Sequence, residues 1–124
     1  MAYRTHLMSN LPSTLPHTKF EPLMTLYLTD NTTPEEITKA YETGYIKACK
    51  YYPAGATTNS DAGVTDVKKT YPALHQMAKL GMILCIHSEV STPTIDIFDR
   101  EPVFIEQIIK PLVKDIPTLK ITME

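Results

Sequence analysis

The sequence lacks several features that define specialised classes of protein. It has no tryptophan and only four glycines in 124 residues. It contains no Gly-rich phosphate-binding pattern, no Walker motif and no nucleophile elbow. The longest apolar run, residues 82–86, is far shorter than the roughly 20 residues that span a bilayer. We therefore expect neither a P-loop nucleotide-binding protein nor a membrane protein.

An excess of charge of one sign is also missing. Twelve Lys and Arg residues against fourteen Asp and Glu residues give a net charge of −2, spread along the chain. Nucleic-acid binders need a basic surface to neutralise phosphates, so nucleic acid is not an expected partner. No basic segment followed by an apolar one begins the chain, which predicts a cytoplasmic protein. Cys49 and Cys85 are then expected to be reduced thiols in apolar surroundings.

The pattern along the chain predicts an α/β fold. Short apolar runs alternate with helical patterns, which is typical of βαβ units around a parallel sheet. The length of 124 residues predicts one domain and excludes a complete eight-stranded barrel, which takes roughly 200 residues or more. We expect strands at residues 3–8, 22–29, 45–52, 82–87 and 118–124.

Three helices are expected between these strands. Thr33, Pro34 and Glu36 form a capping box at the start of a helix that Gly44 ends. A second helix runs from residue 65 to Gly81, and a third pattern, over residues 99–114, has an apolar stripe that Pro102 and Pro111 interrupt. Residues 11–21 show no helical pattern, although a parallel crossover usually needs a dozen or more residues. Either the first strand does not pair in parallel with the second, or a helix is missing there.

Ligands of parallel α/β sheets bind beyond the carboxyl ends of the strands, where Asn10, Lys50 and His87 are expected. Lys50 is either a lysine that extends past the strand end into solvent or a desolvated amine. A desolvated amine could serve as a nucleophile, a Schiff base or a metal-binding carbamate. His87 is either a core residue or a metal ligand. The polar loop at residues 55–63, which contains Thr57 and Thr58, is either a solvated connection or a lid over a substrate.

Three stretches of the sequence resemble a known family. Residues 50–60 (KYYPAGATTNS), 86–90 (IHSEV) and 96–101 (DIFDRE) resemble the single-function dihydroorotases of bacteria and fungi, members of the amidohydrolase superfamily. The resemblance covers residues 20–124, and residues 8–11 (MSNL) are similar to the family's M-P-N-L motif. It implies one partial domain of a metal-dependent (β/α)₈ TIM barrel over residues 1–124, holding about strands 2 to 6. Residues 1–19 would form a degenerate strand and a shortened connection.

The resemblance also implies a reaction and a site. The family reversibly cyclises N-carbamoyl-L-aspartate to L-dihydroorotate in the de novo synthesis of pyrimidines (UMP), at two Zn²⁺ ions bridged by a carboxylated lysine. By this resemblance Lys50 is the catalytic, carboxylated lysine and a metal ligand, and His87 is a second metal ligand. Thr57 and Thr58 contact the substrate from a lid, and Asn10 holds its carboxylate. The family also implies a homodimer.

The sequence departs from the family at several positions. The His-x-His motif of the first strand is absent, Ser9 replaces a proline, and the sequence stops at Glu124, just before a further metal-binding histidine of the family. With only Lys50 and His87 as ligands, we expect the isolated chain to bind metal weakly and to be inactive. The alternative is a non-catalytic α/β piece that self-associates or pairs with a complementary barrel fragment, because open strand edges would need partners.

Overall fold

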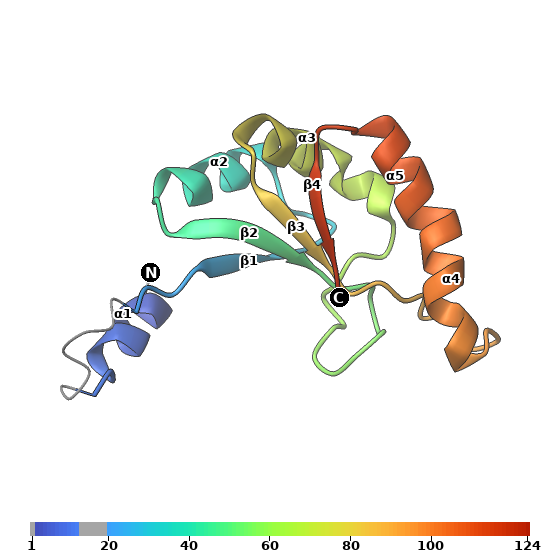
Figure 1. Cartoon of the computed structure of the whole chain (residues 1–124), viewed down its shortest axis with the longest axis horizontal. Helices are drawn as coiled ribbons and strands as arrows, with labels where there is room; N and C mark the ends of the chain where they lie inside the picture. Colours follow the sequence, from blue (N-terminus) through green and yellow to red (C-terminus); the bar gives the residue numbers. More distant parts are fainter. Residues whose placement is uncertain (1, 13–19) are drawn as a thin grey trace.

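A four-stranded parallel sheet forms the centre of the computed structural model, which describes residues 2–12 and 20–124 (Figure 1). Its strands, in spatial and sequence order, are β1 (Met24–Leu28), β2 (Ile46–Tyr51), β3 (Ile83–Ile86) and β4 (Lys120–Met123). Each strand pairs in parallel with the next one along the chain. The predicted parallel α/β architecture and four of the five predicted strands are therefore confirmed.

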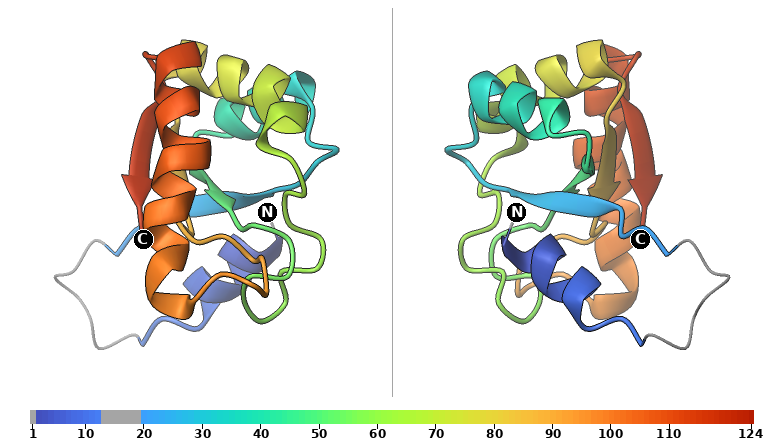
Figure 2. Two further views of the ribbon diagram at one scale, coloured as in Figure 1. Left: turned by 90° about the vertical axis from the view of Figure 1, so that its right-hand side faces the viewer. Right: turned by 90° about the vertical axis from the view of Figure 1, so that its left-hand side faces the viewer.

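The helices that connect the strands lie over one face of the sheet (Figures 1 and 2). They are α2 (Pro34–Glu42), α3 (Tyr71–Leu80) after a 3₁₀ turn η1 (Val67–Thr70), and a long last helix. The last helix begins after the 3₁₀ turn η2 (Ile97–Asp99) and joins α4 (Arg100–Phe104), the π-helical η3 (Ile105–Ile109) and α5 (Lys110–Asp115). None of the described helices is both long and apolar enough to cross a membrane.

Local sequence signals explain where two of these helices begin and end. At the start of α2, the Thr33 hydroxyl accepts from the Glu36 amide at 3.2 Å, and the Glu36 carboxylate accepts from the Thr33 amide at 2.8 Å. This is the predicted capping box. Gly81 ends α3 with a φ of 69°, a left-handed conformation that glycine adopts without steric cost.

The last helix runs without a break past Pro102 and Pro111, the two prolines that interrupt its apolar stripe. Pro111 has no amide hydrogen, and its ring would collide with the carbonyl four residues earlier in an α-helix. The five residues of η3 instead form a wider turn, in which the Lys110 amide donates to the Ile105 carbonyl. The π-helical turn thus accommodates the proline without ending the helix.

The hydrophobic core lies between the sheet and these helices. Alternate strand residues, among them Leu28, Cys49 and Leu84, are fully buried against the helical layer. The helices contribute side chains that are at most 2% exposed: Ile37, Leu74, Met77, Phe104 and Leu112. Burial of each large apolar side chain contributes about 1.5–3 kcal/mol to folding, so this layer holds the strands in their order.

The opposite face of the sheet is much less covered. Tyr27 and Ile83 point to this face and are each 38% exposed. Of the described helices, only α1 (Ala2–Ser9) lies on this side, near β1 (Figure 2). Within the described part of the chain, β1 and β4 each have one neighbouring strand, so both outer edges of the sheet are unpaired.

The strand predicted at residues 3–8 is wrong, because these residues belong to α1. A strand needs a neighbour to satisfy its backbone groups, whereas a helix satisfies its own. Ala2, Arg4 and Leu7 favour a helix, and the Arg4 guanidinium lies 3.9 Å from the centroid of the Tyr45 ring. Most of the predicted shortened connection, residues 13–19, lies outside the described residues.

Candidate functional site

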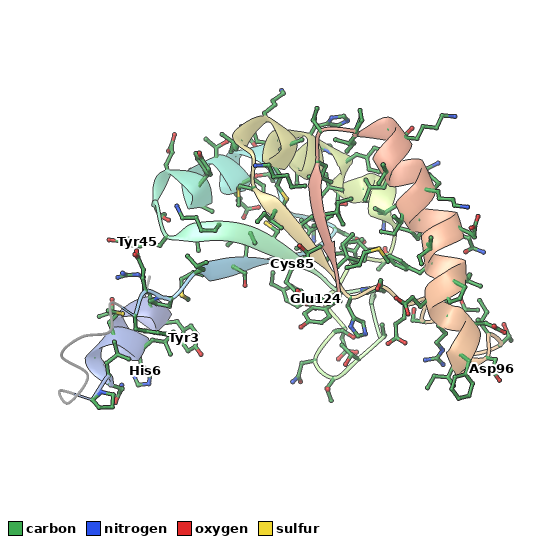
Figure 3. The ribbon with its side chains drawn as sticks, viewed as in Figure 1. Tyr3, His6, Tyr45, Cys85, Asp96 and Glu124 are labelled. Atoms are coloured by element: carbon green, nitrogen blue, oxygen red, sulfur yellow. The ribbon has the colours of Figure 1, made fainter. Side chains whose placement is uncertain are left out.

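The carboxyl ends of β2, β3 and β4 bring several polar side chains together on the uncovered face. The strand register aligns Tyr27, Lys50, Cys85 and Thr122 in one row across the sheet. Tyr52, His87 and Glu124 come two residues further along their chains, beyond the same row. Figure 3 shows Cys85 and Glu124 close together at this end of the sheet. The structure therefore places both Lys50 and His87 at the carboxyl end of the sheet, as the sequence predicts.

Lys50 of β2 forms an ion pair with Glu124, the residue that follows β4. The Lys50 side chain is only 15% exposed, and its Nζ lies 5.0 Å from the centroid of the Tyr52 ring. The backbone of Glu124 is fixed as well, since its amide donates to the Ile86 carbonyl at 2.9 Å. Lys50 is therefore a largely buried ammonium group with a carboxylate partner. Conversion of its amine to a carbamate requires this pair to separate.

The two cysteines are free thiols, as predicted. Burial raises the pKa of Cys85, and the charge of Glu124 and a hydrogen bond to it raise this pKa further, while Lys50 opposes the shift. Burial also raises the pKa of Cys49 to about 12. Because thiolates, not thiols, attack electrophiles and bind metals, neither cysteine is suited to be a nucleophile here.

His87 is held by side chains that the sequence analysis had not assigned to the site. Its Nε2 lies 2.8 Å from Oε1 of Glu89, and the other carboxylate oxygen of Glu89 lies 3.9 Å from Nη1 of Arg100. The Tyr52 ring lies against the imidazole, with 5.7 Å between the ring centroids. These residues, except Tyr52, line a cavity of about 260 Å³ that Glu124 also borders.

Glu124 was noted in the sequence only for its position beside a family histidine. Strand alternation over residues 120–124 would have placed it on the same face as Lys120 and Thr122, and therefore toward Lys50. Arg100 belongs to the 96–101 stretch that resembles the family, but the sequence analysis assigned it no role, because it reaches the site only through the packing of α4.

The loop after β2 is folded around one buried hydroxyl. The Ser60 side chain donates to the Thr57 carbonyl at 2.6 Å and accepts from the Thr57 amide at 3.0 Å. The Gly63 amide donates to the Ser60 carbonyl at 2.8 Å, and the Val64 amide donates to the Tyr52 carbonyl at 2.8 Å. Ser60 is 1% exposed, whereas Thr57 and Thr58 are exposed to solvent. The loop thus presents two hydroxyls from a preformed scaffold.

Asn10 is not brought to this group of residues. It follows the end of α1, and its side-chain amide donates to the His6 carbonyl at 2.8 Å. His6 lies well away from Cys85 and Glu124 (Figure 3). A role for Asn10 at the site therefore requires the N-terminal residues to take a different position.

The described residues do not complete a metal site. Among them, no cluster of three or more His, Cys, Asp or Glu side chains is arranged to hold a metal ion. Lys50 and His87 would supply two donors, one of them only after the Lys50–Glu124 pair separates, while a catalytic zinc normally takes three protein ligands. The arrangement as it stands does not fit the two zinc ions that the sequence resemblance implies.

Comparison with known proteins agrees with the sequence resemblance. The chain is 56% identical over 123 residues to the dihydroorotase of Cupriavidus taiwanensis and 53% identical over 124 residues to that of Vibrio cholerae. These matches cover 99% and 100% of this chain, and 35% of each relative. The chain thus spans about a third of the length of the dihydroorotases that it matches. No family model matches the chain.

Solved structures agree with the fold. A dihydroorotase from Campylobacter jejuni matches with a TM-score of 0.80 and 34% identity, over 98% of this chain and 33% of that one. A Saccharomyces cerevisiae dihydroorotase solved with 5-fluoroorotic acid matches with a TM-score of 0.78 and 33% identity, over 97% of this chain and 34% of that one. The parallel sheet and its helices are therefore a partial TIM barrel, as predicted.

Proposed function

We propose that this chain is one part of a catalytic dihydroorotase domain. The activity would be the reversible, zinc-dependent cyclisation of N-carbamoyl-L-aspartate to L-dihydroorotate in pyrimidine synthesis. All 124 residues would belong to a single partial amidohydrolase domain acting on this small substrate. A homodimer and a cytoplasmic location are part of the same proposal.

The observation that carries the proposal is the convergence of Lys50, His87 and the loop with Thr57 and Thr58. Lys50 is the second-last residue of β2, and His87 and the loop follow the ends of β3 and β2. All three therefore lie at the carboxyl end of the sheet, where α/β barrels place their active sites. Together with identity above 50% to dihydroorotases over the whole chain, this placement favours the family's reaction over an unrelated α/β activity.

The roles that we propose for the residues are those that the sequence resemblance implies. Lys50, as a carbamate, and His87 would be metal ligands, and Lys50 would thereby be catalytic. Thr57 and Thr58 would donate hydrogen bonds to the polar substrate from the exposed loop. Asn10 would bind the substrate carboxylate only after it leaves the His6 carbonyl.

Hydrolysis of dihydroorotate in the presence of Zn²⁺ and bicarbonate tests the activity of this chain. Because Lys50 and His87 alone do not complete a zinc site, we expect no turnover by the isolated chain. Turnover that Lys50→Ala abolishes and Lys47→Ala preserves would contradict the expected inactivity and support the site. Lys47 is a matched control, since it is an exposed lysine of the same strand. Turnover that survives Lys50→Ala would remove Lys50 from the mechanism.

A second candidate function is that of a non-catalytic association module. The uncovered sheet face and the unpaired outer edges of β1 and β4 favour it, because open edges readily pair with other strands. Sedimentation velocity over a range of protein concentrations tests this candidate. A second copy, or an added fragment with the remaining strands of a relative, would shift the sedimentation coefficient. If the chain stays monomeric at all concentrations and does not bind the added fragment, this second candidate function is excluded.

A further inference from the structure

The imidazole of His87 has one ring nitrogen with a partner and one without. Nε2 lies 2.8 Å from the Glu89 carboxylate, a distance typical of a charge-assisted hydrogen bond. Within residues 2–12 and 20–124, Nδ1 of His87 has no hydrogen-bond partner. The ring is also restricted on one side by Tyr52, which stacks in turn on Tyr27 with 5.6 Å between their centroids.

The Glu89 carboxylate is itself held in place. Its second oxygen faces the Arg100 guanidinium at 3.9 Å, and each of the two side chains is about three-quarters buried. The backbone supports this contact, because the Val90 amide donates to the Arg100 carbonyl at 3.4 Å. Nε of Arg100 is buried and has no hydrogen-bond partner among the described residues. The segment after β3 and the start of α4 thus meet at Glu89.

We propose that Glu89 is the positioning residue of His87. It holds Nε2–H of the imidazole and leaves Nδ1 as the ring nitrogen that is open to a ligand. Arg100 anchors Glu89 in this role. The inference rests on the proposed function for what Nδ1 would bind, but the hold on the ring exists without a ligand.

A carboxylate that contacts one nitrogen of an imidazole also determines what the other nitrogen can bind. A neutral imidazole has one N–H donor and one acceptor nitrogen, and the partner of one nitrogen decides the role of the other. A carboxylate behind a ligating histidine fixes its orientation and makes the ligating nitrogen more basic. An ordinary surface ion pair would do neither, because it would leave the ring free to rotate.

Proton NMR of the ¹⁵N-labelled chain at pH 8 tests the hold on the ring. In the unchanged chain, the Nε2 proton of His87 should give a resolved resonance. Glu89→Ala should remove this resonance or speed its exchange with water at least about tenfold, since no charge-assisted bond must then open first. Glu89→Gln should retain it, because the amide oxygen still accepts. Glu101→Ala, which changes a neighbouring carboxylate of the same cavity, is the matched control and should leave the resonance unchanged.

Two results of this proton-exchange experiment would overturn the proposal. One is a Nε2 proton that exchanges equally fast in the unchanged chain and in Glu89→Ala. The other is loss of the resonance in Glu101→Ala with no loss in Glu89→Ala. If Glu89→Ala does not fold, as judged by circular dichroism, the comparison is made on Glu89→Gln. Its Nε2 resonance should then persist but move upfield, and an unmoved resonance would contradict the role of Glu89.

Addition of Zn²⁺ separates this inference from the proposed function. If the Nδ1 resonance of His87 shifts while Nε2 keeps its proton, the result supports both the positioning role of Glu89 and metal binding by His87. Loss of the Nε2 proton with Zn²⁺ bound at Nε2 overturns the positioning role. If no His87 resonance responds to Zn²⁺, the metal-binding part of the proposed function fails, whereas the hold by Glu89 still stands on the proton-exchange result.

Discussion

Asp30 links the end of β1 to the chain that leads into α3, and its substitution should weaken the fold in a pH-dependent way. Its carboxylate accepts from the Thr65 amide at 2.8 Å, from the Thr65 hydroxyl at 2.5 Å and from Nζ of Lys69 at 2.8 Å. Hydrogen bonds from Lys69, then from Thr65, lower the pKa of Asp30 from 3.8 to about 2. This carboxylate therefore stabilises the folded state whenever it is ionised.

The size of the effect follows from this shift of the pKa. The free energy that corresponds to it is at most about 2.5 kcal/mol. The Lys69 side chain is 53% exposed, so solvent screening reduces the contribution of Asp30 to about 1–2 kcal/mol. Because the pKa is lowered on folding, the stabilisation is complete above about pH 4–5 and is lost as the pH falls toward 2.

Urea denaturation followed by circular dichroism at several pH values measures this contribution. Asp30→Asn should lower the free energy of unfolding by about 1–2 kcal/mol at pH 7. The difference from the unchanged chain should shrink as the pH falls from 4 to 2. Asp61→Asn, a change of an exposed aspartate in the loop after β2, is the control and should have little effect. An equal loss at pH 7 and pH 2, or an equal loss in Asp61→Asn, would refute the reasoning.

Four further substitutions test the packing and the local signals. Gly63→Ala should cost about 2–4 kcal/mol, because its Cβ would lie 2.4 Å from the Tyr52 carbonyl oxygen. Gly44→Ala, with open space around its Cβ but a φ of +75°, should cost only about 1 kcal/mol, and an equal cost would contradict the crowding at Gly63. Phe104→Ala should cost about 3–5 kcal/mol by cavity formation, which urea denaturation would show. Thr33→Ala should cost about 1 kcal/mol through loss of the capping box, and an unchanged midpoint would contradict this.

The sequence was sufficient where one local signal decides the structure. The Thr33 capping box, the Gly81 stop and the alternation in β2 predicted their elements correctly, because the interactions involved span only a few residues. The N-terminal helix α1 was missed, because a short segment with apolar residues suits a strand or a helix, and no strand of the described residues pairs with it.

The site was predictable only in part, for the same physical reason. The positions of Lys50 and His87 at strand ends follow from the order of strands and turns. The Lys50–Glu124 pair joins residues 74 positions apart, and the contact of Arg100 with Glu89 depends on how the start of α4 packs. Such contacts depend on the register and packing of the whole sheet, which no short motif specifies.

The most direct test of the central claim uses a chimera. The matching 123 residues of the Cupriavidus taiwanensis dihydroorotase, which are 56% identical, would be replaced by this chain, and hydrolysis of dihydroorotate measured. We predict an active chimera that Lys50→Ala inactivates and Lys47→Ala leaves active. A folded chimera without activity, or one whose activity survives Lys50→Ala, would contradict the account.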